Sequence, residues 1–128
     1  PDMRTPIAHA LAWPERLDAG VRSLDLFEVA QLSFERPDSL RFPCLELAYR
    51  ALRAGGTAST VLNADNEEAV SAFLDRRLGF TRIADVISAS LDTIASTAAR
   101  TLGDVLEADA RARSVSRSLI SRWMEEMV

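Results

Sequence analysis

The second half of this 128-residue chain repeats apolar residues at helical spacing, and this pattern limits the folds open to it. After Pro37, four segments place apolar side chains three and four residues apart, and proline, glycine and polar runs separate them. Each segment has one apolar face that must be buried against another element. Four such segments joined by short connections are typical of a helical bundle. The sequence therefore predicts a mainly α fold, with an antiparallel, four-helix-type bundle over residues 39–128.

Prolines and glycines predict where these helices begin and end. Pro43 is expected to open the first helix, and the pair Gly55-Gly56 to stop it. The second covers residues 57–78, and we expect the polar run at 63–66 to bend or restart it, because Asn and Asp side chains compete for backbone hydrogen bonds. Thr81 is the expected cap of the third helix. The fourth helix closes the chain.

The predicted core joins the apolar stripes of these helices. The first helix is expected to bury the face that carries Leu45, Ala48, Tyr49 and Leu52. Across the bundle the predicted core residues are Leu45, Leu52, Phe73, Leu74, Ile83, Ile87, Leu91, Val115, Leu119 and Trp123.

The first 38 residues lack a sustained helical period. Residues 5–13 predict a helix of about two turns, with Thr5 as its cap and Pro14 as its end. Residues 15–38 predict an extended linker with a short strand near 31–35, because their apolar runs are short and patchy. The predicted organisation is therefore a segment over 1–14, a linker over 15–38 and a bundle over 39–128.

Composition excludes several classes of function. The net charge of −4 argues against binding to nucleic acid, which requires a basic surface. The sequence contains no Lys, which excludes a Schiff-base or phosphate-loop lysine within it. One Cys and one His make neither an internal disulfide nor a closed zinc site, and we expect a reducing, cytoplasmic location. No apolar run is long enough for a membrane span, and we expect Pro1 to be internal to a longer polypeptide.

Two single residues invite a catalytic interpretation. His9 is the only histidine and could act as a general base near neutral pH, but no carboxylate or nucleophile is placed beside it by the sequence. Cys44 follows Pro43 at a helix start, where the helix dipole favours a thiolate. For both residues a structural role is favoured, and Cys44 is expected to be a small buried residue.

Two charged groups invite a binding interpretation. Asp65, Glu67 and Glu68 are a carboxylate cluster, but they lack the spacing and the glycine of a calcium loop, so solvated positions at a helix start are favoured. A row of arginines on the last helix could bind phosphate. The acids between them and the negative total charge favour a solvated face. These residues are Arg111, Arg113, Arg117 and Arg122.

Five stretches of the sequence stand out at a characteristic spacing: PDMRTPIAHALAWPER at 1–16, LDL at 24–26, LSFERPD at 32–38, RFPCL at 41–45 and VLNADNE at 61–67. Through these stretches the sequence resembles the 1-deoxy-D-xylulose 5-phosphate reductoisomerases over nearly its whole length. One departure is Asp65, where the family usually has Ala; we expect it to affect a helix junction.

The resemblance implies the C-terminal part of a three-part enzyme. In that family an NADPH-binding domain and a metal-containing catalytic domain precede a helical bundle, and residues 1–14 would end the catalytic domain. The family isomerises and reduces 1-deoxy-D-xylulose 5-phosphate to 2-C-methyl-D-erythritol 4-phosphate in non-mevalonate isoprenoid biosynthesis, using NADPH and Mg, Mn or Co. It is typically homodimeric. The segment alone is expected to be inactive and to bind neither cofactor nor metal.

The same resemblance assigns a role to two residues and leaves one alternative open. Pro1 and Met3 match a Pro-x-Met motif at the edge of the family's active site, which offers apolar contacts near the nicotinamide and the substrate. Arg4 and His9, which follow, are given structural roles.

No catalytic or metal-binding residue is assigned within the segment. The alternative is a standalone helical interaction module, and the sequence upstream of Pro1 would distinguish the two.

Overall fold

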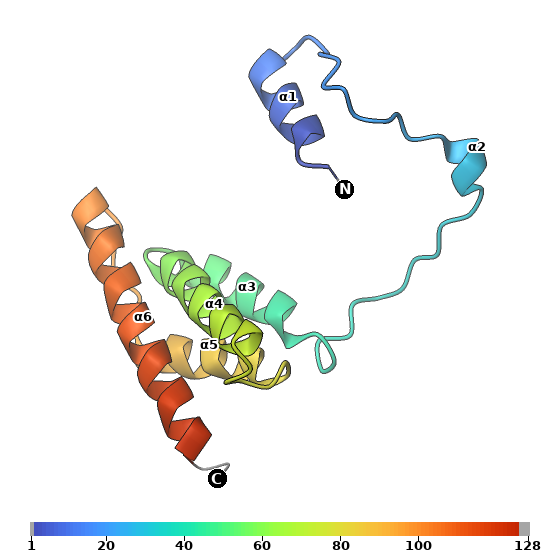
Figure 1. Ribbon diagram of the computed structural model, residues 1–128. Helices are drawn as coiled ribbons and strands as arrows, with labels where there is room; N and C mark the ends of the chain where they lie inside the picture. The colour runs from blue at the N-terminus through green and yellow to red at the C-terminus, as the bar shows by residue number, and fades with distance from the viewer. Residues whose placement is uncertain (1, 126–128) are drawn as a thin grey trace. The chain divides into compact units, whose positions relative to one another are not determined.

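A computed structural model describes residues 2–125, and these contain six helices and no strand (Figure 1). The mainly α fold predicted from the sequence is confirmed. The predicted strand near residues 31–35 is wrong, because a strand requires a neighbour to take its backbone hydrogen bonds, and the described part of the chain offers none. The chain divides into two compact units, Pro1–Arg36 and Pro37–Val128, and each is considered by itself.

The first unit contains helices α1 (Arg4–Ala12) and α2 (Leu26–Val29). Helix α1 begins with Met3 rather than Thr5 as its N-cap residue, because the Asp2 carboxylate accepts a hydrogen bond from the Arg4 amide at 2.9 Å. Helix α2 was not predicted. It is a single turn in which Asp25 Oδ1 accepts hydrogen bonds from the amides of Phe27 at 2.8 Å and Glu28 at 3.3 Å.

The second unit contains α3 (Pro43–Ala54), α4 (Ala58–Leu74), α5 (Arg82–Thr93) and α6 (Leu102–Glu125). Helix α4 contacts the three other helices of this unit and is its centre (Figure 1). Helix α3 packs against α4 and α5, whereas α6 packs against α4 and α5 on another side. This arrangement is the predicted helical bundle.

Several predicted helix ends are confirmed, and one predicted break is absent. Pro43 occupies the first position of α3, and Gly55, with φ of 67°, follows its last residue. Helix α4 runs without interruption through residues 63–66, so the predicted bend is wrong. The reason is that the Asp65 side chain bonds to Ser90 of α5 and Ser116 of α6 instead of competing for backbone groups. Thr81 precedes α5 but makes no side-chain capping bond.

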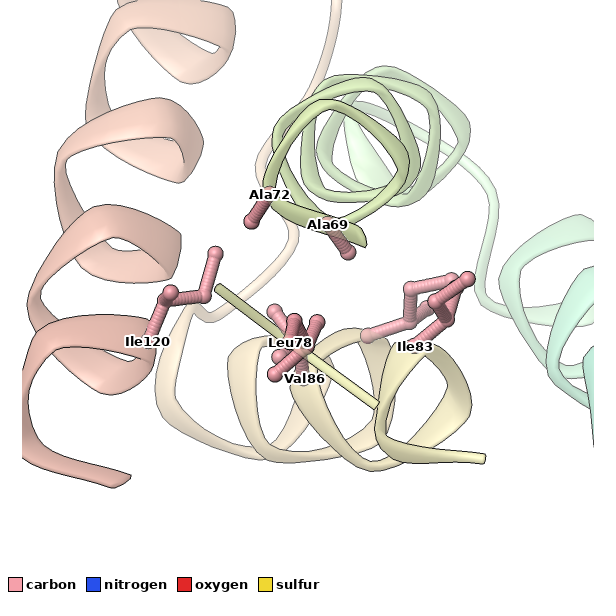
Figure 2. Close-up of a cluster of buried hydrophobic side chains, with 7 residues drawn as sticks. Ala69, Ala72, Leu78, Ile83, Val86 and Ile120 are labelled. Atoms are coloured by element: carbon pink, nitrogen blue, oxygen red, sulfur yellow. The ribbon is translucent and has the colours of Figure 1, made fainter. Parts of the chain in front are cut away.

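The core forms where α4 presents small residues to α5 and α6. Figure 2 shows Ala69 and Ala72 of α4 facing Ile83 and Val86 of α5 and Ile120 of α6, with Leu78 from the connection between α4 and α5. A second cluster joins Val61 and Ala64 of α4 to Ile94 and Ala112. Alanines on the central helix let the neighbouring helices approach closely, so that branched residues fill the space between them.

The predicted core is right on α5 and α6 and wrong on α3. Ile83, Ile87 and Leu119 are buried, and Leu91, Val115 and Trp123 are partly buried against the core. The residues whose predicted burial is wrong are Leu45, Leu52, Phe73 and Leu74, which are exposed.

The physical reason on α3 is its rotation. This helix buries Ala51 and half-buries Leu47, and the Arg50 guanidinium donates to the Leu91 carbonyl at 3.3 Å and to Asp92 at 2.6 Å on α5. These contacts turn the face with Leu52, which is 72% exposed, toward solvent. Phe73 and Leu74, at the end of α4, lie away from the face that α5 and α6 cover.

Candidate functional site

The candidate site residues predicted from the sequence lie at the start of α1. Pro1 lies outside the described residues. Met3 has helical backbone geometry, with φ of −67° and ψ of −17°, and it is 67% exposed. The thioether is therefore accessible, and Met is a flexible side chain that adapts to flat apolar surfaces.

Asp2 and Arg4 lie on either side of Met3 and bind each other. Arg4 Nη2 is 2.7 Å from Asp2 Oδ2, and Arg4 Nε is 3.1 Å from both carboxylate oxygens. This pairing holds the pKa of Asp2 below its ordinary value and raises the pKa of Arg4. Both groups therefore stay charged at neutral pH, and the pair orders the backbone on both sides of Met3.

Helix α1 has no buried residue within its unit. Ile7, Leu11 and Trp13 are all exposed, although their apolar surface is large. The His9 ring lies edge-on to the Trp13 ring, with centroids 5.5 Å apart and an interplanar angle of 88°. This contact gives His9 a packing partner at the end of α1.

Cys44 is exposed at the second position of α3, so its predicted burial is wrong. The cause is again the rotation of α3, which buries Ala51 and half-buries Leu47.

Glu67 and Glu68 of α4 form one ion-pair network with Asp109, Arg113 and Arg117 of α6. Arg113 Nη2 lies 2.7 Å from Glu67, Arg113 Nε lies 2.8 Å from Asp109, and Arg117 Nη2 lies 2.7 Å from Glu68. Hydrogen bonds from these arginines lower the pKa of Glu67 and Glu68. The prediction that these carboxylates are solvated is therefore only partly right, because the Glu68 side chain is just 16% exposed.

The network leaves little capacity for a ligand. Arg113 and Arg117 direct their guanidinium groups at carboxylates, whereas Arg111 and Arg122 occupy exposed positions. Over the described residues, no three His, Cys, Asp or Glu side chains converge as a metal site would require.

Asp65 departs most from its predicted environment. It is 0% exposed, although it was expected to be solvated. Its Oδ1 accepts hydrogen bonds from Ser90 Oγ at 2.9 Å and Ser116 Oγ at 2.6 Å, while Oδ2 has no hydrogen-bond partner within the described part of the chain. Burial raises the pKa of this carboxyl to about 6, although both serine hydroxyls act in the opposite direction.

A signal for this burial was present in the sequence. The buried face of α4 includes residues 58, 61, 65, 69 and 72, which are spaced by three and four. Asp65 completes that stripe, and Ser90 and Ser116 lie on the buried faces of α5 and α6. Polar residues in an apolar stripe on three neighbouring helices therefore predict a buried polar cluster.

Comparison with known families identifies the domain. The family described as the DXP reductoisomerase C-terminal domain matches residues 1–115. The chain belongs to this family. The predicted resemblance to 1-deoxy-D-xylulose 5-phosphate reductoisomerases is therefore confirmed.

Curated relatives carry the name of the whole enzyme. The chain is 66% identical over 120 residues to the 1-deoxy-D-xylulose 5-phosphate reductoisomerase of Aromatoleum aromaticum, which covers 94% of this chain and 30% of the relative. It is 60% identical over 122 residues to that of Burkholderia cenocepacia, which covers 95% of this chain and 31% of the relative. The chain thus spans about a third of the length of these DXP reductoisomerases.

Solved structures of DXP reductoisomerases share the fold. The enzyme from Zymomonas mobilis, in complex with NADPH, matches with a TM-score of 0.82 and 44% identity over 94% of this chain and 32% of that one. A second structure, described as DOX-P reductoisomerase with fosmidomycin and magnesium, matches with a TM-score of 0.85 and 40% identity over 98% of this chain and 33% of that one.

No helix among the described residues is long and apolar enough to cross a membrane.

Proposed function

We propose that this chain is the C-terminal portion of a 1-deoxy-D-xylulose 5-phosphate reductoisomerase. In this proposal the full-length protein isomerises and reduces 1-deoxy-D-xylulose 5-phosphate to 2-C-methyl-D-erythritol 4-phosphate with NADPH, in non-mevalonate isoprenoid biosynthesis. The observation that carries the proposal is identity of 66% over 94% of the chain to an enzyme of that name. The NADPH complex of the Zymomonas mobilis structure supports the choice of cofactor.

The cofactor and metal are assigned to other parts of the longer protein. NADPH supplies the hydride, and Mg, Mn or Co is the divalent metal of the proposed reaction. The described residues do not bring together three metal ligands, and the sequence has no lysine for a phosphate group. The proposed contribution of this chain is therefore structural support and one wall of the active site.

Within that wall, Met3 and Pro1 are the proposed contacts to the nicotinamide and the substrate. The accessible side chain of Met3 supports this role, because an exposed apolar group next to a fixed backbone is available to a ligand. The pairing of Asp2 with Arg4 keeps two charges bound to each other beside it. An apolar contact of this kind contributes shape and excludes water from the reacting centre.

The proposal includes a chain context. The preceding domains of the same polypeptide are the proposed partners of α1, whose apolar side chains are exposed within its own unit. A cytoplasmic homodimer is the proposed assembly. A standalone helical interaction module is not favoured, because the sequence matches relatives about three times its length.

The test compares the full-length protein with the 128-residue chain. With 1-deoxy-D-xylulose 5-phosphate, Mg²⁺ and NADPH, the full-length protein should consume NADPH and form 2-C-methyl-D-erythritol 4-phosphate. The isolated chain should show neither turnover nor tight binding, measured by nucleotide fluorescence for NADPH and by calorimetry for Mn²⁺. A full-length protein without this activity would refute the proposed reaction. Micromolar binding by the isolated chain would refute the assignment of these ligands to other domains.

A further inference from the structure

The buried carboxyl of Asp65 has no role in the proposed reaction, yet it joins three helices. Asp65 lies on α4, Ser90 on α5 and Ser116 on α6, and all three residues are 0% exposed. Both serine hydroxyls donate to the same oxygen, Oδ1, at 2.9 Å and 2.6 Å. The three side chains are therefore a polar contact within the mostly apolar interior.

The second oxygen of this carboxyl makes the contact sensitive to charge. Oδ2 is buried and has no hydrogen-bond partner within residues 2–125. A buried carboxylate whose charge is not balanced is costly, whereas the neutral acid leaves a much smaller penalty. The geometry therefore favours the protonated form of Asp65 in the folded bundle relative to the unfolded chain.

Charged groups of the surrounding helices do not neutralise Asp65. On α4 and α6, Glu67, Glu68, Asp109, Arg113 and Arg117 pair with one another. On α5, Arg82 pairs with Asp85, and Asp92 pairs with Arg50 of α3. The other charged side chains described on α6 occupy exposed or half-exposed positions: Asp104, Glu107, Arg111 and Arg122.

We propose that Asp65, Ser90 and Ser116 form a proton-sensitive lock that holds α5 and α6 on α4. The folded bundle binds a proton at Asp65 in mildly acidic solution, and the three helices are held less tightly once that proton is lost. Ser90 and Ser116 keep their bonds to Oδ1 in both states, so the lock loosens without a change in the partners of Asp65.

The sign and size of the effect follow from proton linkage. The folded-state pKa of Asp65, about 6, is above the ordinary aspartate value of 3.8, so folding takes up a proton between these two pH values. The contribution of Asp65 to stability is complete below the lower value and is lost as pH rises through the upper one. The folding constant should fall about tenfold per pH unit in this window, or about 100-fold in all.

The test measures hydrogen exchange of α5 and α6 peptides in the full-length protein at pH 4, 5, 6 and 7, with correction for the intrinsic exchange rate. The variant Asp65→Asn keeps the shape of the side chain and cannot ionise. Asp85→Asn, on an exposed position of α5, is the matched control. The protection of Asp65→Asn divided by that of the natural protein should rise about 50-fold from pH 4 to pH 7, while the same ratio for the control variant changes little.

A pH-independent ratio for Asp65→Asn would overturn the proposal. If that variant does not fold, Ser116→Ala provides the second test. The hydroxyl of Ser116 lowers the pKa of Asp65, so its removal should extend the loss of protection to higher pH and increase the total loss, while the pH at which the loss begins stays the same. An unchanged pH profile for folded Ser116→Ala would equally overturn the proposal. Neither result depends on catalytic activity, so failure of the lock and failure of the proposed reaction are distinguishable.

Discussion

Replacing Gly56 with alanine should destabilise the helical unit more than the same change at Gly55. Both glycines lie in the turn between α3 and α4 and have positive φ, 67° at Gly55 and 53° at Gly56. A Cβ at Gly56 would overlap the backbone carbonyl of Thr97 and lie 2.9 Å from Ser96 Oγ. A Cβ at Gly55 would meet nothing within 4 Å. Gly55 is therefore a control with backbone strain but without steric overlap.

The magnitude follows from the bonds at this turn. The Thr57 amide donates to the Thr97 carbonyl at 2.9 Å, and the Thr97 amide donates to Thr57 Oγ1 at 3.1 Å. Moving Thr97 away from a new methyl group breaks both, at about 0.5–1.5 kcal/mol each. Holding an alanine at position 56 in a left-handed backbone conformation costs about 1–2 kcal/mol more. Gly56→Ala should therefore cost about 2–5 kcal/mol, whereas Gly55→Ala should cost only its backbone strain, about 1–3 kcal/mol.

The assay is urea denaturation of the 128-residue chain followed by far-ultraviolet circular dichroism, with hydrogen exchange to locate the change. Gly56→Ala should have the lower midpoint and faster exchange at Thr57 and Thr97. Gly55→Ala should leave exchange at Thr97 close to that of the natural chain. Equal loss of stability in the two variants, with unchanged exchange at Thr97, would refute the steric argument.

Three further predictions concern the proposed site, Cys44 and the surface network. In the full-length enzyme, Met3→Ala should lower kcat/KM through lost packing, by an amount that corresponds to about 1–3 kcal/mol of transition-state stabilisation. Cys44→Ala should leave kcat nearly unchanged. Steady-state kinetics of both variants test this pair, and a folded but inactive Cys44 variant would contradict the structural role of Cys44. Glu68→Gln should lower the thermal midpoint at pH 7, and this effect should shrink as pH falls below 4.5, because Glu68, whose pKa Arg117 lowers, stabilises the fold only while its carboxyl group is ionised. Scanning fluorimetry across this pH range tests the prediction.

The sequence predicted helix ends and the α5 core because local chemistry decides both. Pro43 has a fixed φ that suits the first helical position, and Gly55 adopts a positive φ that other residues avoid. On α5 the apolar stripe with Ile83 and Ile87 is buried, as its spacing predicted. Each of these features depends on neighbours within about one turn of helix.

The rotation of α3 was not predictable from its own pattern. Its more apolar face, with Leu45, Tyr49 and Leu52, is exposed, while Ala51 is buried. In this rotation Arg50 bonds to Leu91 and Asp92, which are about forty residues away along the chain. Helix amphipathicity indicates that one face is buried, but tertiary contacts decide which face it is within this unit.

The proposed site could be predicted only by resemblance. Nothing in the composition around Met3 distinguishes it from an ordinary exposed residue. Asp65 is the opposite case, because its position in the buried stripe of α4 was readable from spacing. It was missed because an aspartate was assumed to be solvated, whereas two hydroxyls from other helices reach it inside the core.

Asp65 and the surface carboxylates give the bundle two pH dependences of opposite sign. The lowered pKa of Glu67 and Glu68 means that stability rises as these groups ionise, and this gain is complete above their unfolded value of 4.5. The raised pKa of Asp65 means that stability falls as pH increases toward about 6. Because the gain is complete above 4.5 while the loss continues up to about 6, the combined contribution of these groups falls as pH rises between these two values. Removing the Asp65 carboxylate by Asp65→Asn should leave only the rise, so the variant should reach a plateau where the natural protein declines.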